Sequence, residues 1–168
     1  HCETALKVAR FLESNEHISW VKYPDLPGDE DYELAKKYLP NGSCGVVSFG
    51  VKGGRKAAET FMKHLKLAAI ETHVADARTC CLHPASSTHR QMNDSELEAA
   101  GVSHDLVRMS CGLENADELI ADIAQALVYE QVDKVAVEHG YDVLVAATGD
   151  GLVALFAGEG ARVVGGKP

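Results

Sequence analysis

The sequence lacks the features that mark membrane proteins, secreted proteins and nucleic-acid-binding proteins. No apolar run approaches the roughly 18–20 residues that a membrane-spanning helix needs, and no basic segment followed by an apolar one opens the chain as a signal peptide would. The formal net charge is −9, and the sixteen Lys and Arg residues are scattered along the chain. Because phosphate binding requires clustered basic side chains, we expect no nucleic-acid partner and no anionic membrane partner.

The cysteines do not form the pattern of a disulfide framework or of a redox motif. There are five of them, an odd number, and no two are spaced as C-x-x-C. This pattern favours a reducing, cytoplasmic environment. Cys80, Cys81 and Cys111 stand in apolar, strand-like runs, so we expect them to be buried as small hydrophobic side chains.

The apolar residues that are present predict helices alternating with short strands through residue 127. The 168 residues suffice for one domain with a sizeable core, or for a domain with an appendage. The sequence does not begin with Met, which suggests a piece of a longer protein. Apolar spacing predicts helices over residues 3–13, 29–39, 55–67, 95–100 and 116–127, strands over 18–23, 44–51, 79–82 and 105–111, and a connection or strand over 68–74. This order predicts a small open sheet covered by helices, either parallel α/β or mixed α+β, with the strand directions left open.

The character of the sequence changes at Val128. Residues 129–139 are predicted to be helical, and residues 143–147 form an unbroken apolar run typical of a buried parallel strand. A helix over 152–158 and a strand over 161–164 would then complete a compact β-α-β-like unit. The predicted organisation is therefore a main domain over residues 1–127 and an α/β tail over residues 128–168.

The stretch from Asp76 to His89 is the best candidate for a ligand site. A strand from Thr79 to Leu82 opens at His83 into a polar loop rich in hydrogen-bond donors, and Arg108 stands in a later strand. Such a loop beside an arginine is suited to hold a small carboxylate, although an ordinary polar turn would have the same composition.

Other polar groups along the chain carry weaker signals. His83 and His89 have no third ligand at metal spacing, so we expect hydrogen bonding or capping from them and no metal site. Ser86, Ser87 and Thr88 are expected to serve as turn and cap residues. Ser95 is expected to be the N-cap of the short helix that runs through residue 100. The Gly53–Gly54 pair lacks the remaining residues of a phosphate-binding loop, and Gly149–Gly151 is expected to be a turn that needs glycine.

Several motifs, in order and over three-quarters of the chain, resemble one enzyme family. Residues 1–127 resemble the C-terminal domain of O-acetylhomoserine sulfhydrylases, which belong to the pyridoxal-phosphate (PLP)-dependent Cys/Met metabolism family. The segments that carry this resemblance are Val21–Pro27, Leu34–Pro40, Phe49–Gly54, Asp76–Thr79, His83–His89, Ala99–Val102 and Leu106–Asn115.

The resemblance implies a fold and a substrate site, and it implies that the domain with the cofactor lysine is not in this chain. The implied fold is the C-terminal domain of aspartate-aminotransferase-type enzymes, a small mixed and largely antiparallel sheet with helices over one face. The implied site residues are Arg108, which would bind the carboxylate of a small amino-acid substrate, and Thr79 beside it. The family's cofactor lysine lies in a large domain that this chain does not contain, so the resemblance implies no PLP binding and no catalysis by this chain alone, and it leaves the oligomeric state open.

The full-length enzyme would use PLP to replace the acetate of O-acetylhomoserine with sulfide, giving homocysteine. Residues 141–166 instead resemble the C-terminal region of fatty-acid-kinase and dihydroxyacetone-kinase-like proteins, through short glycine-containing segments. Together the two resemblances imply a fusion of unrelated pieces, natural or engineered. The alternative is an inactive, stand-alone or chimeric module with no enzymatic role.

Overall fold

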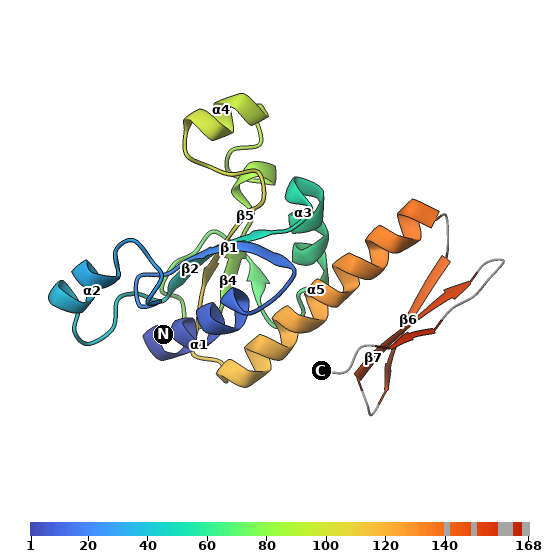
Figure 1. The fold of residues 1–168 in the computed structure, drawn as a ribbon, viewed down its shortest axis with the longest axis horizontal. Helices are drawn as coiled ribbons and strands as arrows, with labels where there is room; N and C mark the ends of the chain where they lie inside the picture. Colours follow the sequence, from blue (N-terminus) through green and yellow to red (C-terminus); the bar gives the residue numbers. More distant parts are fainter. Residues whose placement is uncertain (140–141, 149–150, 158–162, 166–168) are drawn as a thin grey trace.

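The structure is a computed structural model that describes residues 1–139, 142–148, 151–157 and 163–165. Its helices and strands follow one another along the chain as a mixed α and β protein (Figure 1). The helices are α1 (Cys2–Glu13), α2 (Tyr32–Tyr38), α3 (Gly54–His64), α4 (Asp94–Ala99) and α5 (Ala116–His139), with a 3-10 turn η1 (Pro84–Ser86). The strands are β1 (Ile18–Lys22), β2 (Val46–Val51), β3 (Ala69–Ile70), β4 (Cys80–Leu82), β5 (Leu106–Ser110), β6 (Asp142–Thr148), β7 (Gly151–Ala157) and β8 (Val163–Gly165).

The main sheet has the strand order β1-β2-β5-β4-β3. The β3–β4 pair is parallel and the other pairs are antiparallel, so the sheet is mixed and largely antiparallel. This confirms the mixed α+β sheet among the alternatives left open by the sequence. The central position of β5 matters for function, because it brings Arg108 opposite Ser48 of β2 and Leu82 of β4.

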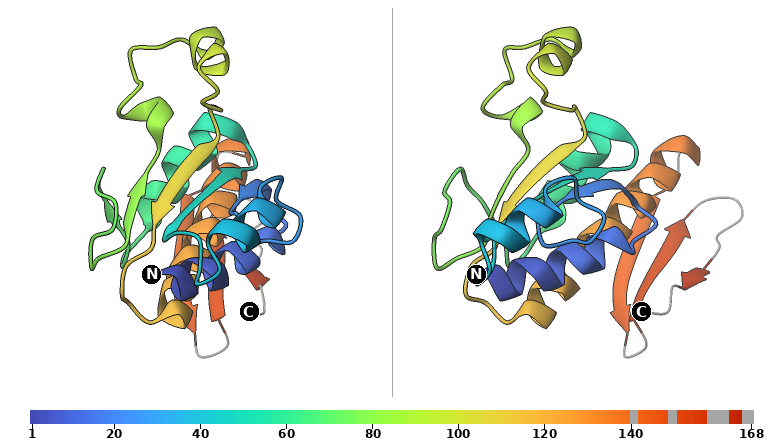
Figure 2. Two further views of the ribbon diagram at one scale, coloured as in Figure 1. Left: turned by 90° about the vertical axis from the view of Figure 1, so that its left-hand side faces the viewer. Right: turned by 60° about the vertical axis from the view of Figure 1, so that its left-hand side comes forward.

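The core lies where α1, α3 and α5 pack on the sheet and on one another (Figure 2). The amphipathic pattern of these helices explains the arrangement, since each one presents an apolar stripe that must be covered. Fully buried side chains of the sheet and the helices meet there, including Val47, Phe49, Val107, Met109, Val8, Leu12, Phe61, Leu119 and Ile123. Cys80, Cys81 and Cys111 are buried and all five cysteines are free thiols, which confirms the predicted role of these three.

The tail is an antiparallel sheet, so the predicted β-α-β unit is wrong. Strand β7 pairs with β6 in antiparallel register from Asp142 opposite Ala157 to Thr148 opposite Gly151, and β8 pairs with β7. The segment predicted as a helix over 152–158 is thus a strand through residue 157. Its run of Leu, Val and Phe suits a strand, and the adjacent β6 offers it a full set of backbone partners. Gly149 and Asp150 lie outside the described residues.

Helix α5 runs without a break across the predicted boundary at residues 127 and 128. The family-like segment and the tail are therefore joined by one continuous helix in place of the two shorter helices that the sequence predicted. The described helices are too short or too polar to span a bilayer.

Candidate functional site

Arg108 occupies the middle of the central strand β5. Side chains alternate between the two faces of a strand, and the fully buried neighbours Val107 and Met109 belong to the helix-covered core. Arg108 therefore points to the other face, where it is only partly buried. A cation at this position is fixed by a rigid element and can still be reached from solvent.

The Arg108 guanidinium has few partners of its own. Its Nη2 donates to the carbonyl oxygen of Thr72 at 2.8 Å. Its Nε is buried and has no hydrogen-bond partner, and in the described part of the chain only Gln125 Oε1 shares that condition. Among the residues whose side chains are described, no carboxylate lies within ion-pair distance of Arg108. The site thus contains a positive charge and a buried donor that the described residues do not satisfy.

Thr79 is placed differently from Arg108. Its side chain is fully buried, and its hydroxyl donates to Glu114 Oε2 at 2.7 Å while accepting the Gly112 amide at 2.8 Å. The Thr79 amide donates to the other Glu114 oxygen at 2.6 Å. Burial would raise the pKa of Glu114, but these two hydrogen bonds from Thr79 lower it overall.

The structure does not join Thr79 and Arg108 through a contact. Thr79 directly precedes Cys80, which pairs with Ser110, whereas Arg108 pairs with Leu82 further along β4. In the observed arrangement Thr79 ties the start of β4 to the segment after β5. Its role in binding a substrate stays a prediction.

The segment over residues 71–78 also belongs to the site, and its first part, residues 71–75, was not indicated by the sequence. The residues of this segment are all exposed, and the Thr72 carbonyl near its start accepts a hydrogen bond from Arg108. The Ala75 amide donates to Ser110 Oγ at 3.1 Å, and Ala75 has a φ of 60°, a left-handed conformation that is strained for a residue with a Cβ. The contact to Arg108 uses a backbone atom, so residue types alone carried no signal for it.

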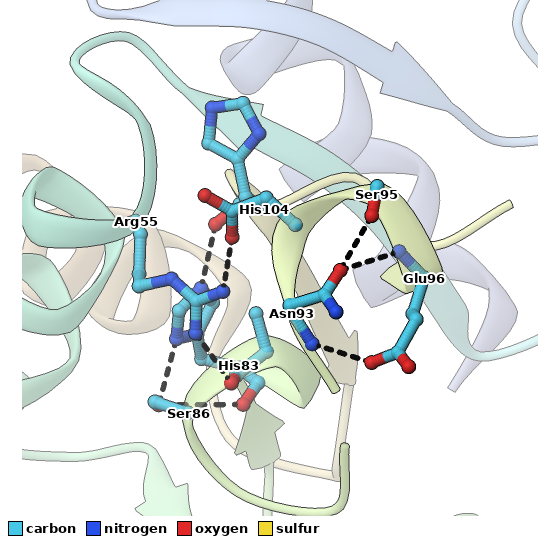
Figure 3. Close-up of polar contacts among 9 residues, drawn as sticks. Arg55, His83, Ser86, Asn93, Ser95, Glu96 and His104 are labelled. Carbon is cyan, nitrogen blue, oxygen red and sulfur yellow. Dashed lines mark hydrogen bonds and ion pairs between the residues drawn. The ribbon is translucent and has the colours of Figure 1, made fainter. Parts of the chain in front are cut away.

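The polar loop after β4 is held by hydrogen bonds, as the sequence predicted for His83. His83 Nε2 contacts the His104 carbonyl at 3.0 Å and Nδ1 contacts Ser86 Oγ at 2.7 Å (Figure 3). Arg55 of α3 donates to the Ala85 carbonyl at 2.7 Å and to Asp94 at 2.6 Å. These contacts fix η1 against α3 and against the segment that leads into β5.

The N-cap of helix α4 lies two residues earlier than predicted. Its N-cap is Asn93, whose side chain accepts the Glu96 amide at 3.0 Å while the Glu96 carboxylate accepts the Asn93 amide at 2.8 Å (Figure 3). The prediction of Ser95 as the cap was therefore wrong, because the glutamate three residues after Asn93 completes a reciprocal capping box there. Within the described residues, no group of three His, Cys, Asp or Glu side chains could hold a metal ion.

The lysines of residues 1–131 do not provide a site for PLP. Every lysine in residues 1–131 is exposed to solvent. A lysine that forms an imine with a cofactor is usually desolvated in a pocket, which lowers its pKa and makes the amine nucleophilic. The described residues therefore do not fit PLP by themselves.

Comparisons with known proteins agree on one family. The model of the Cys/Met metabolism PLP-dependent enzymes matches residues 1–128. Homocysteine synthase of Schizosaccharomyces pombe is 44% identical over 127 residues, which are 76% of this chain and 30% of that protein. O-acetyl-L-homoserine sulfhydrylase of Leptospira meyeri is 43% identical over 128 residues, which are 76% of this chain and 29% of that protein.

A solved structure shows the same fold. It is that of a putative O-acetylhomoserine (thiol)-lyase from Campylobacter jejuni, determined with N'-pyridoxyl-lysine-5'-monophosphate. It is 38% identical, has a TM-score of 0.70 and is matched over 76% of this chain and 30% of its own length. The chain thus spans about a third of the length of the relatives it matches.

Proposed function

The chain belongs to the family of PLP-dependent enzymes of Cys/Met metabolism, and we propose that it is the C-terminal part that binds the substrate carboxylate at Arg108. The substrate class is a small amino acid, with O-acetylhomoserine as the specific candidate because sulfhydrylases of that substrate are among the relatives. A cytoplasmic location, predicted from the unpaired cysteines, belongs to the same proposal.

The unsatisfied guanidinium of Arg108 carries this proposal. A partly buried charge is costly unless it is paired, and the only hydrogen-bond partner of Arg108 among the described residues is the neutral carbonyl of Thr72. A carboxylate would offer two acceptor oxygens to the fork of the guanidinium, which is the geometry that arginine binds best. It would also neutralise the charge for which the described residues supply no counterion.

Within the full-length enzyme, Arg108 would bind and orient the substrate. By fixing the carboxylate on a rigid strand, it would limit the positions that the rest of the amino acid can take, which lowers the entropic cost of reaction. PLP, when bound to the enzyme, supplies the electron sink for replacing the acetate by sulfide. Because no described lysine is enclosed, we propose that this chain alone has no sulfhydrylase activity.

Thr79 remains a proposed second contact. Its hydroxyl hydrogen is donated to Glu114, so it would have to leave that carboxylate before it could be donated to a substrate. A Thr79→Val variant separates the two roles. Weaker binding of the amino acid at unchanged stability would support a contact, whereas lower stability at unchanged binding would leave Thr79 with a structural role alone.

The Arg108 proposal is tested by NMR titration of the chain with O-acetyl-L-homoserine. We expect saturable shifts of amide resonances from β5 and from residues 71–78, and no such shifts with the methyl ester, which lacks the carboxylate. Arg108→Ala should abolish the response, whereas Arg10→Ala, which removes an exposed arginine on α1, should retain it. Equal responses in the wild type and Arg108→Ala would remove Arg108 from this role and favour an inactive folded module.

The absence of cofactor binding is tested separately by visible absorbance. After PLP has been added and the excess dialysed away, we expect no stoichiometric imine band from the chain. A retained band at one cofactor per chain would show that this chain holds PLP by itself.

A further inference from the structure

Ser86 and His83 form a hydrogen-bonded pair whose hydrogen positions are set by chemistry. The His104 carbonyl can only accept a hydrogen bond, so the His83 Nε2 that lies 3.0 Å from it must carry the hydrogen. In the neutral ring, Nδ1 is then an acceptor. Ser86 Oγ lies 2.7 Å from Nδ1 and 3.5 Å from the His83 carbonyl, so its hydroxyl hydrogen is donated to the imidazole, which is much the closer acceptor (Figure 3).

The two members of the pair lie in opposite environments. His83 is 2% exposed, and this burial lowers its pKa, although its hydrogen bond to the His104 backbone opposes the shift. The ring is therefore neutral and able to take a proton at neutral pH. Ser86 is exposed at the end of η1, so its hydroxyl can be approached from solvent.

The geometry distinguishes Ser86 from the serine next to it. Ser87 Oγ donates to the backbone carbonyl of His83 at 2.5 Å, and a carbonyl is far too weak a base to remove the proton. Both serines are exposed and stand at the same turn. Only the first of them is hydrogen-bonded to a base whose orientation is fixed by a third group, which is the general arrangement of an activated nucleophile.

We propose that Ser86 is a nucleophilic serine, activated by His83, that accepts an acyl group from small activated carboxylic esters. In this step the Ser86 oxygen forms a bond to the ester carbonyl carbon while His83 Nδ1 takes the hydroxyl proton. The bond from that carbon to the leaving alkoxide or phenoxide oxygen then breaks, and the proton passes to the leaving group. The products are acyl-Ser86 and an alcohol or phenol, with no oxidant or metal required.

The surrounding backbone predicts a reaction that stops at the acylated serine. The amides of Ser87 and His89 both donate to the Pro84 carbonyl, at 3.1 and 2.9 Å, so they are not free to stabilise an oxyanion. Such donors supply a large part of the rate in enzymes that turn over acyl groups, so both acylation and release are slow without them. Acyl-Ser86 is an alkyl ester with a poorer leaving group than an activated ester has, so Ser86 should be acylated about once per chain, with still slower release. This inference does not rest on the role of Arg108.

The experiment is acetylation by p-nitrophenyl acetate, followed by peptide mapping with mass spectrometry. Ser86 should gain its acetyl group about 10²-fold faster than Ser87 in the same molecule, because general-base assistance contributes roughly 10²–10⁴-fold. Chain unfolded in urea should lose this difference. Acetylation of Ser86 at the rate of Ser87 in the folded chain would overturn the proposal, and this comparison requires no variant.

Matched variants sharpen the result. Ser86→Ala should remove the fast acetylation, whereas Ser87→Ala should retain it, and both replace exposed side chains. His83→Gln should reduce the rate at Ser86 to that at Ser87 in a chain that circular dichroism shows to be folded. Retention of the fast rate in folded His83→Gln would exclude His83 as the base.

Discussion

Asp122 on α5 and Arg108 on β5 are both charged residues in shielded positions, but the chain satisfies them very differently. The Asp122 carboxylate, in a side chain that is 6% exposed, accepts the backbone amides of Lys66, Leu67 and Ala68 at 2.8, 2.9 and 3.0 Å. Among the residues that the structure describes, Arg108 has one carbonyl partner, and its Nε has none. A charged group whose hydrogen bonds are all made within its own chain stabilises the fold. A charged group that lacks hydrogen-bond partners is available to a ligand.

The difference follows from where the two groups lie. Asp122 stands where the chain leaves α3 and turns toward β3, and three successive amides there would otherwise have no helix or strand partner. Arg108 lies on the other face of the sheet, where the exposed segment over residues 71–78 offers its guanidinium only the carbonyl of Thr72. Four predictions test this contrast, from the largest expected effect to the smallest.

Removal of the Asp122 carboxylate should cause the largest loss of stability. Asp122→Ala leaves three backbone amides without their acceptor, and we expect the free energy of unfolding to fall by about 3 kcal/mol or more, since each unsatisfied buried donor costs about 1–3 kcal/mol. Urea denaturation measures the loss. Glu118→Ala, on the exposed side of the same helix, is the control and should cost less than about 1 kcal/mol. Similar losses in both variants would contradict a structural role for Asp122.

Acidification should destabilise the chain through His83, whose two ring nitrogens both have hydrogen-bond partners. Its pKa in the folded chain is lowered by burial, so the unfolded chain binds more protons and stability falls as the pH drops below the ordinary value near 6.5 and toward the folded value. Protonation would also cost the hydrogen bond that Nδ1 accepts from Ser86. Urea denaturation at pH 7.5 and pH 5.5 should show the loss. It should be smaller in His83→Gln, and an equal pH dependence in that variant would exclude His83 as its source.

Replacement of Arg108 should change stability far less than replacement of Asp122. Arg108→Met keeps the aliphatic stem that packs on the sheet and removes a charge without a counterion, so we expect the free energy of unfolding to stay within about 1 kcal/mol of the wild type. Binding of O-acetyl-L-homoserine should nevertheless be lost. A destabilisation as large as that of Asp122→Ala would show that Arg108 stabilises the fold as Asp122 does, which would contradict the proposed difference between the two residues.

The smallest expected effect is a gain at Ala75. Glycine relieves a left-handed strain of about 1–2 kcal/mol but loses about 0.5–1 kcal/mol through its greater freedom in the unfolded chain. Ala75→Gly should therefore raise the free energy of unfolding by roughly 0.5 kcal/mol, as measured by urea denaturation. Loss of stability would show that the observed φ of 60° does not describe this residue in solution.

Local sequence patterns predicted most of the main sheet and the position of Arg108. Helical spacing and short apolar runs gave α1, α3, β2 and β5 to within a few residues, because each of these elements buries one regular face. The prediction for the tail failed because an apolar run such as Leu152–Phe156 suits a helix or a strand equally well. Only the antiparallel pairing of this run with β6 decides between the two.

The finer parts of the site could not be predicted from residue types. The contact of the Thr72 carbonyl with Arg108 uses a backbone atom, and the engagement of Thr79 by Glu114 joins residues that are 35 apart in the sequence. Asn93 took the cap predicted for Ser95 because its partner, Glu96, lies three residues further on. In each case the deciding partner is set by the folded backbone.

The most direct test of the account observes the Arg108 Nε–H resonance itself. In a ¹⁵N-labelled chain this buried proton should give a distinct signal, assigned by its loss in Arg108→Lys. We predict that O-acetyl-L-homoserine moves this resonance downfield in a saturable manner, as the unpaired donor gains a carboxylate acceptor, while the methyl ester leaves it unchanged. A resonance that stays fixed while other signals respond to the amino acid would contradict the assignment of Arg108 as the carboxylate-binding residue.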